Sequence, residues 1–156
     1  MVQAKQKPLQ TAFVYGFVTG VALGISEIAL GFALFFIPYP LATFVGRGAL
    51  ILLVLAYLYA GYGAGRRTGN VGAGTLAGAF TGAFLIVALI VFNYITSFLN
   101  MSLLINYQGL LSIPTNLPGL SPMLSPMTRI TLVFAFYGAI AGTLGGFIGK
   151  QRSKYQ

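Results

Sequence analysis

Four long apolar stretches constrain this chain more than any other feature of its sequence. They cover residues 12–37, 43–65, 71–98 and 128–149. Each is longer than the roughly 20 residues that an α-helix needs to cross about 30 Å of hydrocarbon. Charged residues make up only 6% of the chain, whereas an average soluble domain has about 25%. The sequence therefore predicts an all-α integral membrane protein whose single domain, residues 12–149, is a bundle of four transmembrane helices.

The basic residues predict the orientation of this bundle. With four spans, seven of the nine basic residues fall on one side: Lys5, Lys7, Arg66, Arg67, Lys150, Arg152 and Lys154. Arg47 and Arg129 fall on the other side. Because Lys and Arg collect on the cytoplasmic side of membrane proteins, we expect cytoplasmic tails at 1–11 and 150–156. The seven residues should meet lipid headgroups in what we expect to be a prokaryotic plasma membrane.

The third connection, residues 99–127, is long, uncharged and rich in proline. Pro114, Pro118, Pro122 and Pro126 recur every four residues. Proline removes a backbone donor and clashes with the preceding turn, so this spacing does not fit a regular helix interior. We expect an extended or turn-rich outer loop that lies on the membrane surface, folds over the bundle or covers a partner.

Glycine recurs with a period of four in three of the predicted helices. The repeats are Gly16, Gly20 and Gly24, then Gly74, Gly78 and Gly82, then Gly138, Gly142 and Gly146. This period places each set on one helix face, where missing side chains let two backbones approach closely. The pattern predicts glycine-rich helix interfaces. It leaves open whether the partner helices belong to this chain or to other subunits.

The composition excludes most enzyme chemistry. The chain has no His, Cys or Trp, and its single acidic residue is Glu27. Thiolate metal sites, His-based general bases and carboxylate pairs are therefore impossible within it. We expect no enzymatic activity, no metal and no cofactor. The formal net charge of +8 is explained by anchoring at the membrane surface, so we expect no nucleic-acid partner.

Glu27 is the one candidate for chemistry inside the membrane. It lies near the middle of the first predicted helix, on the face of Gly20 and Gly24. A charged carboxylate at the bilayer centre costs at least about 2.5–3.5 kcal/mol and commonly marks function or a buried partner. Glu27 is therefore either a proton or cation site or a neutral carboxyl group hydrogen-bonded inside a helix interface. Tyr137, predicted to lie at nearly the same depth, is the candidate partner.

Two functions fit these features. The favoured one is a non-catalytic structural or accessory subunit that packs through glycine faces into a larger membrane assembly with other subunits. The alternative is a small oligomeric proton-coupled transporter or channel that uses Glu27. The plan of four helices with one carboxylate in the first is similar to that of small multidrug resistance transporters. The missing tryptophan and the long third connection depart from that plan.

Overall fold

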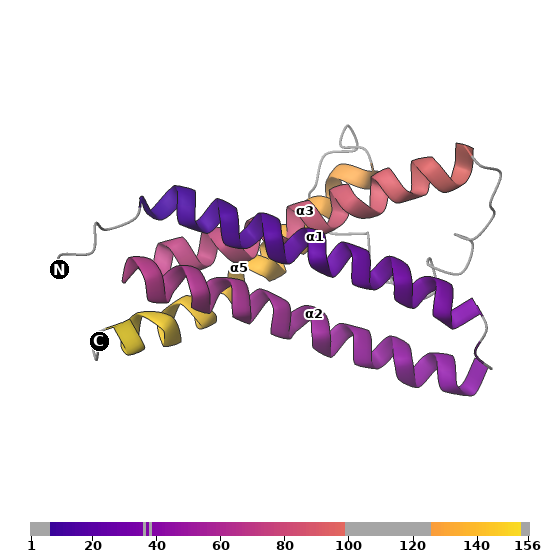
Figure 1. The fold of residues 1–156 in the computed structure, drawn as a ribbon, viewed down its shortest axis with the longest axis horizontal. Helices are drawn as coiled ribbons and strands as arrows, with labels where there is room; N and C mark the ends of the chain where they lie inside the picture. Colours follow the sequence, from indigo (N-terminus) through magenta and orange to yellow (C-terminus); the bar gives the residue numbers. More distant parts are fainter. Residues whose placement is uncertain (1–6, 36, 38, 99–125, 154–156) are drawn as a thin grey trace.

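Four α-helices make up almost all of the structure. The computed structural model describes residues 7–35, 37, 39–98 and 126–153. Within these residues the helices are α1 (Pro8–Phe35), α2 (Tyr39–Thr68), α3 (Val71–Phe98) and α5 (Pro126–Ser153) (Figure 1). Each contains an apolar window of 21 to 24 residues, which is long enough to cross a membrane. The fold is all-helical, and the four spans suggest a multi-pass membrane protein.

Three of the helices extend beyond the apolar stretches that predict them. The α1 helix begins four residues before the predicted start, and its first backbone hydrogen bond runs from Thr11 N to Lys7 O at 3.1 Å. Proline stands in the first turn of three helices, as Pro8, Pro40 and Pro126. A proline is tolerated there because the first amides of a helix have no acceptor within it. Pro126 therefore begins α5, although the sequence places it in the outer loop.

A two-residue link joins α2 to α3. Gly69 has a φ of 65°, a left-handed conformation that glycine adopts without a steric penalty. Its amide donates to Gly65 O at 2.8 Å, which closes α2. The Asn70 side chain then accepts a hydrogen bond from Gly72 N at 2.9 Å and caps the start of α3. The remaining part of the predicted outer loop, 99–125, lies outside the described residues.

The helices form a bundle in which α1 and α5 lie on opposite sides. The helix pairs that pack extensively within the described part of the chain are α3 with α5, α2 with α5, α1 with α3, α2 with α3 and α1 with α2. In Figure 1, the first turns of α1 and α3 and the last turns of α2 and α5 lie together at the left. We call this the basic end, because its described basic residues are Lys7, Arg66, Arg67, Lys150 and Arg152.

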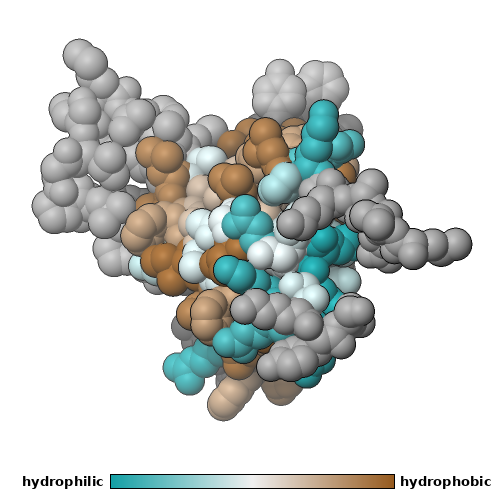
Figure 2. Space-filling model, turned by 90° about the vertical axis from the view of Figure 1, so that its left-hand side faces the viewer, coloured by the Kyte–Doolittle hydropathy of each residue, from teal (hydrophilic) through white to brown (hydrophobic). Residues whose placement is uncertain are grey.

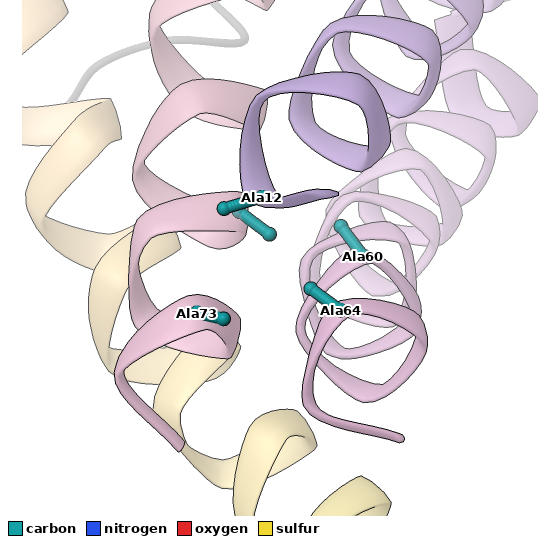
Figure 3. Packing of buried hydrophobic residues seen from close by; sticks show 5 residues of the cluster. Ala12, Ala60, Ala64 and Ala73 are labelled. Atoms are coloured by element: carbon teal, nitrogen blue, oxygen red, sulfur yellow. The ribbon is translucent and has the colours of Figure 1, made fainter. Parts of the chain in front are cut away.

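The core is built from small side chains near the basic end. Ala12 of α1, Ala60 and Ala64 of α2, and Ala73 and Ala77 of α3 are at most 1% exposed and form one cluster. Figure 3 shows the labelled alanines converging from three helices. A methyl group occupies so little space that the helix axes approach closely. In lipid the hydrophobic effect does not drive helices together, so close packing of this kind provides the attraction between them.

A second cluster of larger side chains lies farther from the basic end. It contains Leu23, Leu85, Ile86 and Phe134, all of them buried. Beyond this layer, toward the other end, the described residues of α1 and α2 are mostly exposed or half-buried. In Figure 1 the helices move apart toward this other end. The described bundle is thus packed most tightly in the half that carries the basic end.

Candidate functional site

The glycines of α3 and α5 bring these two helices into backbone contact. A Cβ atom added to Gly78 would overlap the carbonyl oxygen of Gly138, and one added to Gly138 would overlap that of Gly78. At Gly82 an added Cβ would lie 2.7 Å from the carbonyl carbon of Phe134. Real Cβ atoms do not approach a neighbouring backbone this closely. These three positions therefore accept glycine alone unless one helix moves.

Gly142 of α5 also contacts α2. A Cβ added to Gly142 would lie 2.8 Å from Gly78 Cα, and one added to Gly61 of α2 would lie 2.6 Å from Gly142 Cα. One turn along α5, the same arrangement recurs with Gly146 between Gly65 of α2 and Gly74 of α3. We call these six residues the glycine junction: Gly61, Gly65, Gly74, Gly78, Gly142 and Gly146. Three helices thus meet with only hydrogen atoms between their backbones.

The glycines of α1 face α3 in a different way. A Cβ added to Gly20 would lie 2.7 Å from the carbonyl oxygen of Thr81, and one added to Gly24 would lie 2.6 Å from the Cβ of Ala88. Gly16 would meet Phe80 and, at 2.9 Å, the carbonyl oxygen of Ala77. Here the partners of glycine are mostly larger residues rather than glycine. The α1 repeat therefore serves as a groove for α3.

A pair of hydroxyl groups adds a polar contact between α3 and α5. Thr75 Oγ1 and Thr143 Oγ1 lie 2.9 Å apart. Each hydroxyl also lies within hydrogen-bond distance of a carbonyl oxygen of its own helix, Val71 O at 3.3 Å and Ala139 O at 2.7 Å. The two hydroxyl protons are thus shared among three oxygen–oxygen contacts. Hydroxyl groups that bond across helices are a recurrent feature of membrane interfaces.

Glu27 is half-buried on α1, and its predicted depth in the membrane stays a prediction. The α1 helix covers Pro8–Phe35, so Glu27 lies eight residues before the end of the helix. The sequence places it near the bilayer centre because the predicted stretch begins at residue 12 and ends at residue 37. In the structure it lies nearer the end of α1 that leads to α2.

Tyr57 of α2 is the residue that the structure brings toward Glu27. Its side chain is 1% exposed, and Glu27 is close enough to interact with it electrostatically. The Tyr57 hydroxyl is buried and has no hydrogen-bond partner among the described residues. A buried hydroxyl without a partner is rare in proteins and requires an explanation. Sequence analysis of candidate partners for Glu27 favours Tyr137 instead.

Tyr137, the predicted partner of Glu27, is exposed in the described bundle. Tyr137 lies on α5, and α5 is the helix with which α1 shares no extensive contact in the described part of the bundle. Its side chain is 57% exposed and packs edge-on against Phe136, with ring centroids 6.2 Å apart. The direct pairing of Glu27 with Tyr137 stays a prediction from the sequence alone.

The register of the helices separates the two residues further. Gly24 of α1 meets Ala88 of α3, whereas Gly138, the neighbour of Tyr137, meets Gly78 of α3. The two α3 positions are ten residues apart (88 − 78 = 10), which corresponds to roughly 15 Å along a helix. The carboxylate lies three residues past Gly24, in the direction that increases this separation. The backbones of the two residues therefore lie at different levels along the bundle. The Tyr57 ring lies 3.3 Å from a Cβ added to Gly138, so Tyr57 shares the level of Tyr137 and differs from it in facing the bundle interior.

The basic end gathers the described basic residues that the sequence assigns to one side. Arg66 and Arg67 lie in the last turn of α2, and Lys150 and Arg152 lie in the last turn of α5. The Arg67 guanidinium lies 5.4 Å from the centroid of the Tyr15 ring on α1, within range of a cation–π interaction. The predicted headgroup contacts Lys5 and Lys154 lie outside the described residues.

Figure 2 looks onto the basic end and shows hydrophilic residues interspersed with apolar ones. Comparisons of this chain with known protein families, curated proteins and solved structures find no match. Its function therefore has to be argued from the chemistry of its own residues.

Proposed function

We propose that this chain is a non-catalytic integral membrane subunit with a structural or accessory role in a larger membrane protein assembly. The observation that supports the proposal is an exposed aromatic surface on α1 and α3, carried by a bundle that the glycine junction holds rigid. Direct backbone contact between α2, α3 and α5 makes the bundle a closely packed unit whose outer surface is fixed. The glycine faces hold the subunit together, and its contact with other subunits uses a different surface.

The surface that we assign to this contact consists of four phenylalanines on α1 and α3. Phe17 and Phe84 have ring centroids 5.1 Å apart with an interplanar angle of 88°. Phe13 lies edge-on to Phe80 at 5.7 Å and to Phe84 at 5.5 Å. Phe13 and Phe17 are nevertheless almost half exposed. Rings that are already ordered by their neighbours lose little further freedom on binding, which favours association.

Site-specific photo-crosslinking in the membrane of the native host tests this proposal. A photoreactive side chain at Phe17 should form a covalent product with one different membrane protein, identified by mass spectrometry. The matched control is Leu55, a 53% exposed residue of α2, where we expect crosslinks to lipid. Products with lipid alone at both positions, or with a second copy of this chain, would contradict the accessory role.

A second function, a small oligomeric proton-coupled transporter or channel, is favoured by Glu27 and Tyr57. The single acidic side chain of the protein interacts with a tyrosine whose hydroxyl is buried without a partner in the described residues. Ionisable groups within membrane helices are rare and commonly lie on ion or proton pathways. A carboxyl group that releases its proton beside a hydroxyl group can pass it on or exchange it for a cation.

Reconstitution separates the two functions. Proteoliposomes that contain a pH-sensitive dye should acidify after an external acid pulse if the chain conducts protons. Glu27→Gln keeps the size of the side chain but cannot titrate, so it should abolish the flux while the bundle stays folded. A wild-type chain without flux, or a Glu27→Gln variant with unchanged flux, would refute proton transport through Glu27 and leave the accessory role.

A further inference from the structure

The basic end carries positive charge that the chain itself does not neutralise. Its described basic residues are Lys7, Arg66, Arg67, Lys150 and Arg152. The only acidic side chain in the sequence is Glu27, which lies 20 residues after Lys7 along α1. At 1.5 Å per residue this is roughly 30 Å. No acidic side chain of the sequence therefore lies near the basic end.

Helix ends account for only part of this charge. The last turns of α2 and α5 contain four basic residues, Arg66, Arg67, Lys150 and Arg152. Each helix C-terminus has a partial charge of about −0.5, so the two together give about −1. Four full positive charges exceed this several-fold. The helix dipoles offset only part of this positive charge, and the remaining positive charge is available to an anion.

Backbone contacts bring the two basic helix ends together. A Cβ added to Gly149 of α5 would lie 2.8 Å from Arg66 N of α2. On the following turn, a Cβ added to Gly69 would lie 3.7 Å from Ser153 Oγ. Arg67 is turned toward α1 by its contact with Tyr15. Arg152 follows Gly149 by three residues and so lies on the face of α5 that contacts α2. Lys150 lies seven residues after Thr143, on the face that contacts Thr75 of α3. Arg66 is therefore the basic residue of α2 that shares a corner of the bundle with Arg152.

Apolar side chains lie next to this corner, one turn farther from the end. Ile148 of α5 is 51% exposed, and Tyr59 of α2 is 64% exposed. Ile148 precedes Arg152 by four residues, a rise of roughly 6 Å. A ligand bound here meets cations at one level and hydrocarbon side chains immediately beside them. This order matches a phospholipid, whose phosphate lies directly above its acyl chains.

We propose that Arg66 and Arg152 form a binding site for the headgroup of an anionic phospholipid, with its acyl chains along Ile148 and Tyr59. Guanidinium groups bind phosphate oxygens through paired, charge-assisted hydrogen bonds. A single phosphate between the two helix ends neutralises charges from both. The lipid thereby links α2 to α5. The site requires only that the chain spans a membrane, and it does not depend on the accessory role.

Native mass spectrometry and thermal unfolding in a neutral detergent test the site. Adding phosphatidylglycerol should produce stoichiometric lipid adducts and raise the unfolding temperature by several degrees more than phosphatidylcholine does. Each basic residue near an anionic lipid contributes about fivefold in affinity. The variant R66Q/R152Q should therefore bind phosphatidylglycerol about 25-fold more weakly. Exposed side chains are replaced here, so the fold should be retained.

The matched control is R47Q, which removes an exposed arginine of the same helix, α2, at its other end. It should keep the full preference for phosphatidylglycerol. Equal stabilisation by the two lipids, or equal losses in R47Q and in the double variant, would overturn the proposal. Inorganic phosphate at the same concentration should give no comparable shift. A full shift with phosphate alone would assign the corner to a free anion instead of a lipid.

Discussion

Adding one methyl group at Gly78 tests the glycine junction directly. An alanine Cβ at this position would overlap the carbonyl oxygen of Gly138 and lie 2.8 Å from Gly142 Cα. Both partners are backbone atoms, so no side-chain rotation can relieve the overlap. The α5 helix has to move away from α3, and the neighbouring contacts of the junction open with it. Gly78→Ala should therefore destabilise the bundle.

A second glycine provides the control for helix propensity. Gly48 of α2 has no atom within 4 Å of an added Cβ. Alanine is favoured over glycine in a helix by about 0.5–1 kcal/mol, and this gain applies at both positions. The difference between Gly78→Ala and Gly48→Ala therefore isolates the overlap. Overpacking of this kind costs about 1–3 kcal/mol, which corresponds to a factor of roughly 5 to 150 in the unfolding equilibrium.

Unfolding by SDS in mixed micelles measures this difference. Fluorophores on cysteines that replace the exposed residues Gln10 of α1 and Gln151 of α5 report helix separation by energy transfer, and no native cysteine interferes. Gly78→Ala should unfold at a lower SDS fraction than the unsubstituted chain, and Gly48→Ala at an equal or higher one. If both variants unfold at the same SDS fraction, the backbone contact at Gly78 does not exist as described.

Three further predictions concern other parts of the bundle. Thr75→Cys with Thr143→Cys should form a disulfide under mild oxidation, detected as protection from maleimide labelling, because the two hydroxyls are 2.9 Å apart. Single cysteines at Gln151 and Asn116 should be labelled from opposite sides of the membrane, since the sequence places them on the cytoplasmic and outer sides. Tyr57→Phe should stabilise the bundle if the tyrosine hydroxyl binds nothing, as measured in the same SDS titration.

The sequence predicts the number and type of the helices because length and hydropathy alone determine them. The range 71–98 coincides with α3, where a capping turn precedes the apolar stretch. The other helices extend into polar or basic residues at their ends, as α2 does through Arg66 and Arg67 to Thr68. Hydropathy marks where a helix enters the membrane. The helix itself ends where backbone capping becomes available, as at Gly69.

The small residues of the core could have been found by extending the glycine pattern to alanine. Ala60 and Ala64 of α2, like Ala73 and Ala77 of α3, repeat with the same period of four and are buried together. A methyl group differs from hydrogen by one carbon atom, so both residue types allow close helix approach. The signal was present in the sequence, but alanine is so common in membrane helices that its spacing alone does not distinguish a core.

The relative depth of residues on different helices could not be predicted. Placing Tyr137 level with Glu27 depends on the midpoints of two apolar stretches. The true register is set by which small residues interlock, such as Gly24 with Ala88 and Gly78 with Gly138. Sliding one helix along its neighbour by one turn, about 5.4 Å, leaves the hydropathy of both helices unchanged but alters every contact between them. Three-dimensional packing therefore buries Tyr57 beside Gly138, and no sequence motif marks that position.

The Tyr57 hydroxyl gives the sharpest distinction between a structural and a transporting role. A buried polar group without a partner costs about 1–3 kcal/mol, so its removal in Tyr57→Phe should stabilise a bundle in which the hydroxyl binds nothing. If a water molecule, a proton or a cation is shared between Tyr57 and Glu27, the same substitution removes a hydrogen-bond partner and should destabilise the bundle. The SDS titration shows directly whether Tyr57→Phe stabilises or destabilises the bundle. Stabilisation would refute a functional link between the two side chains, and destabilisation that disappears in a Glu27→Gln background would establish it.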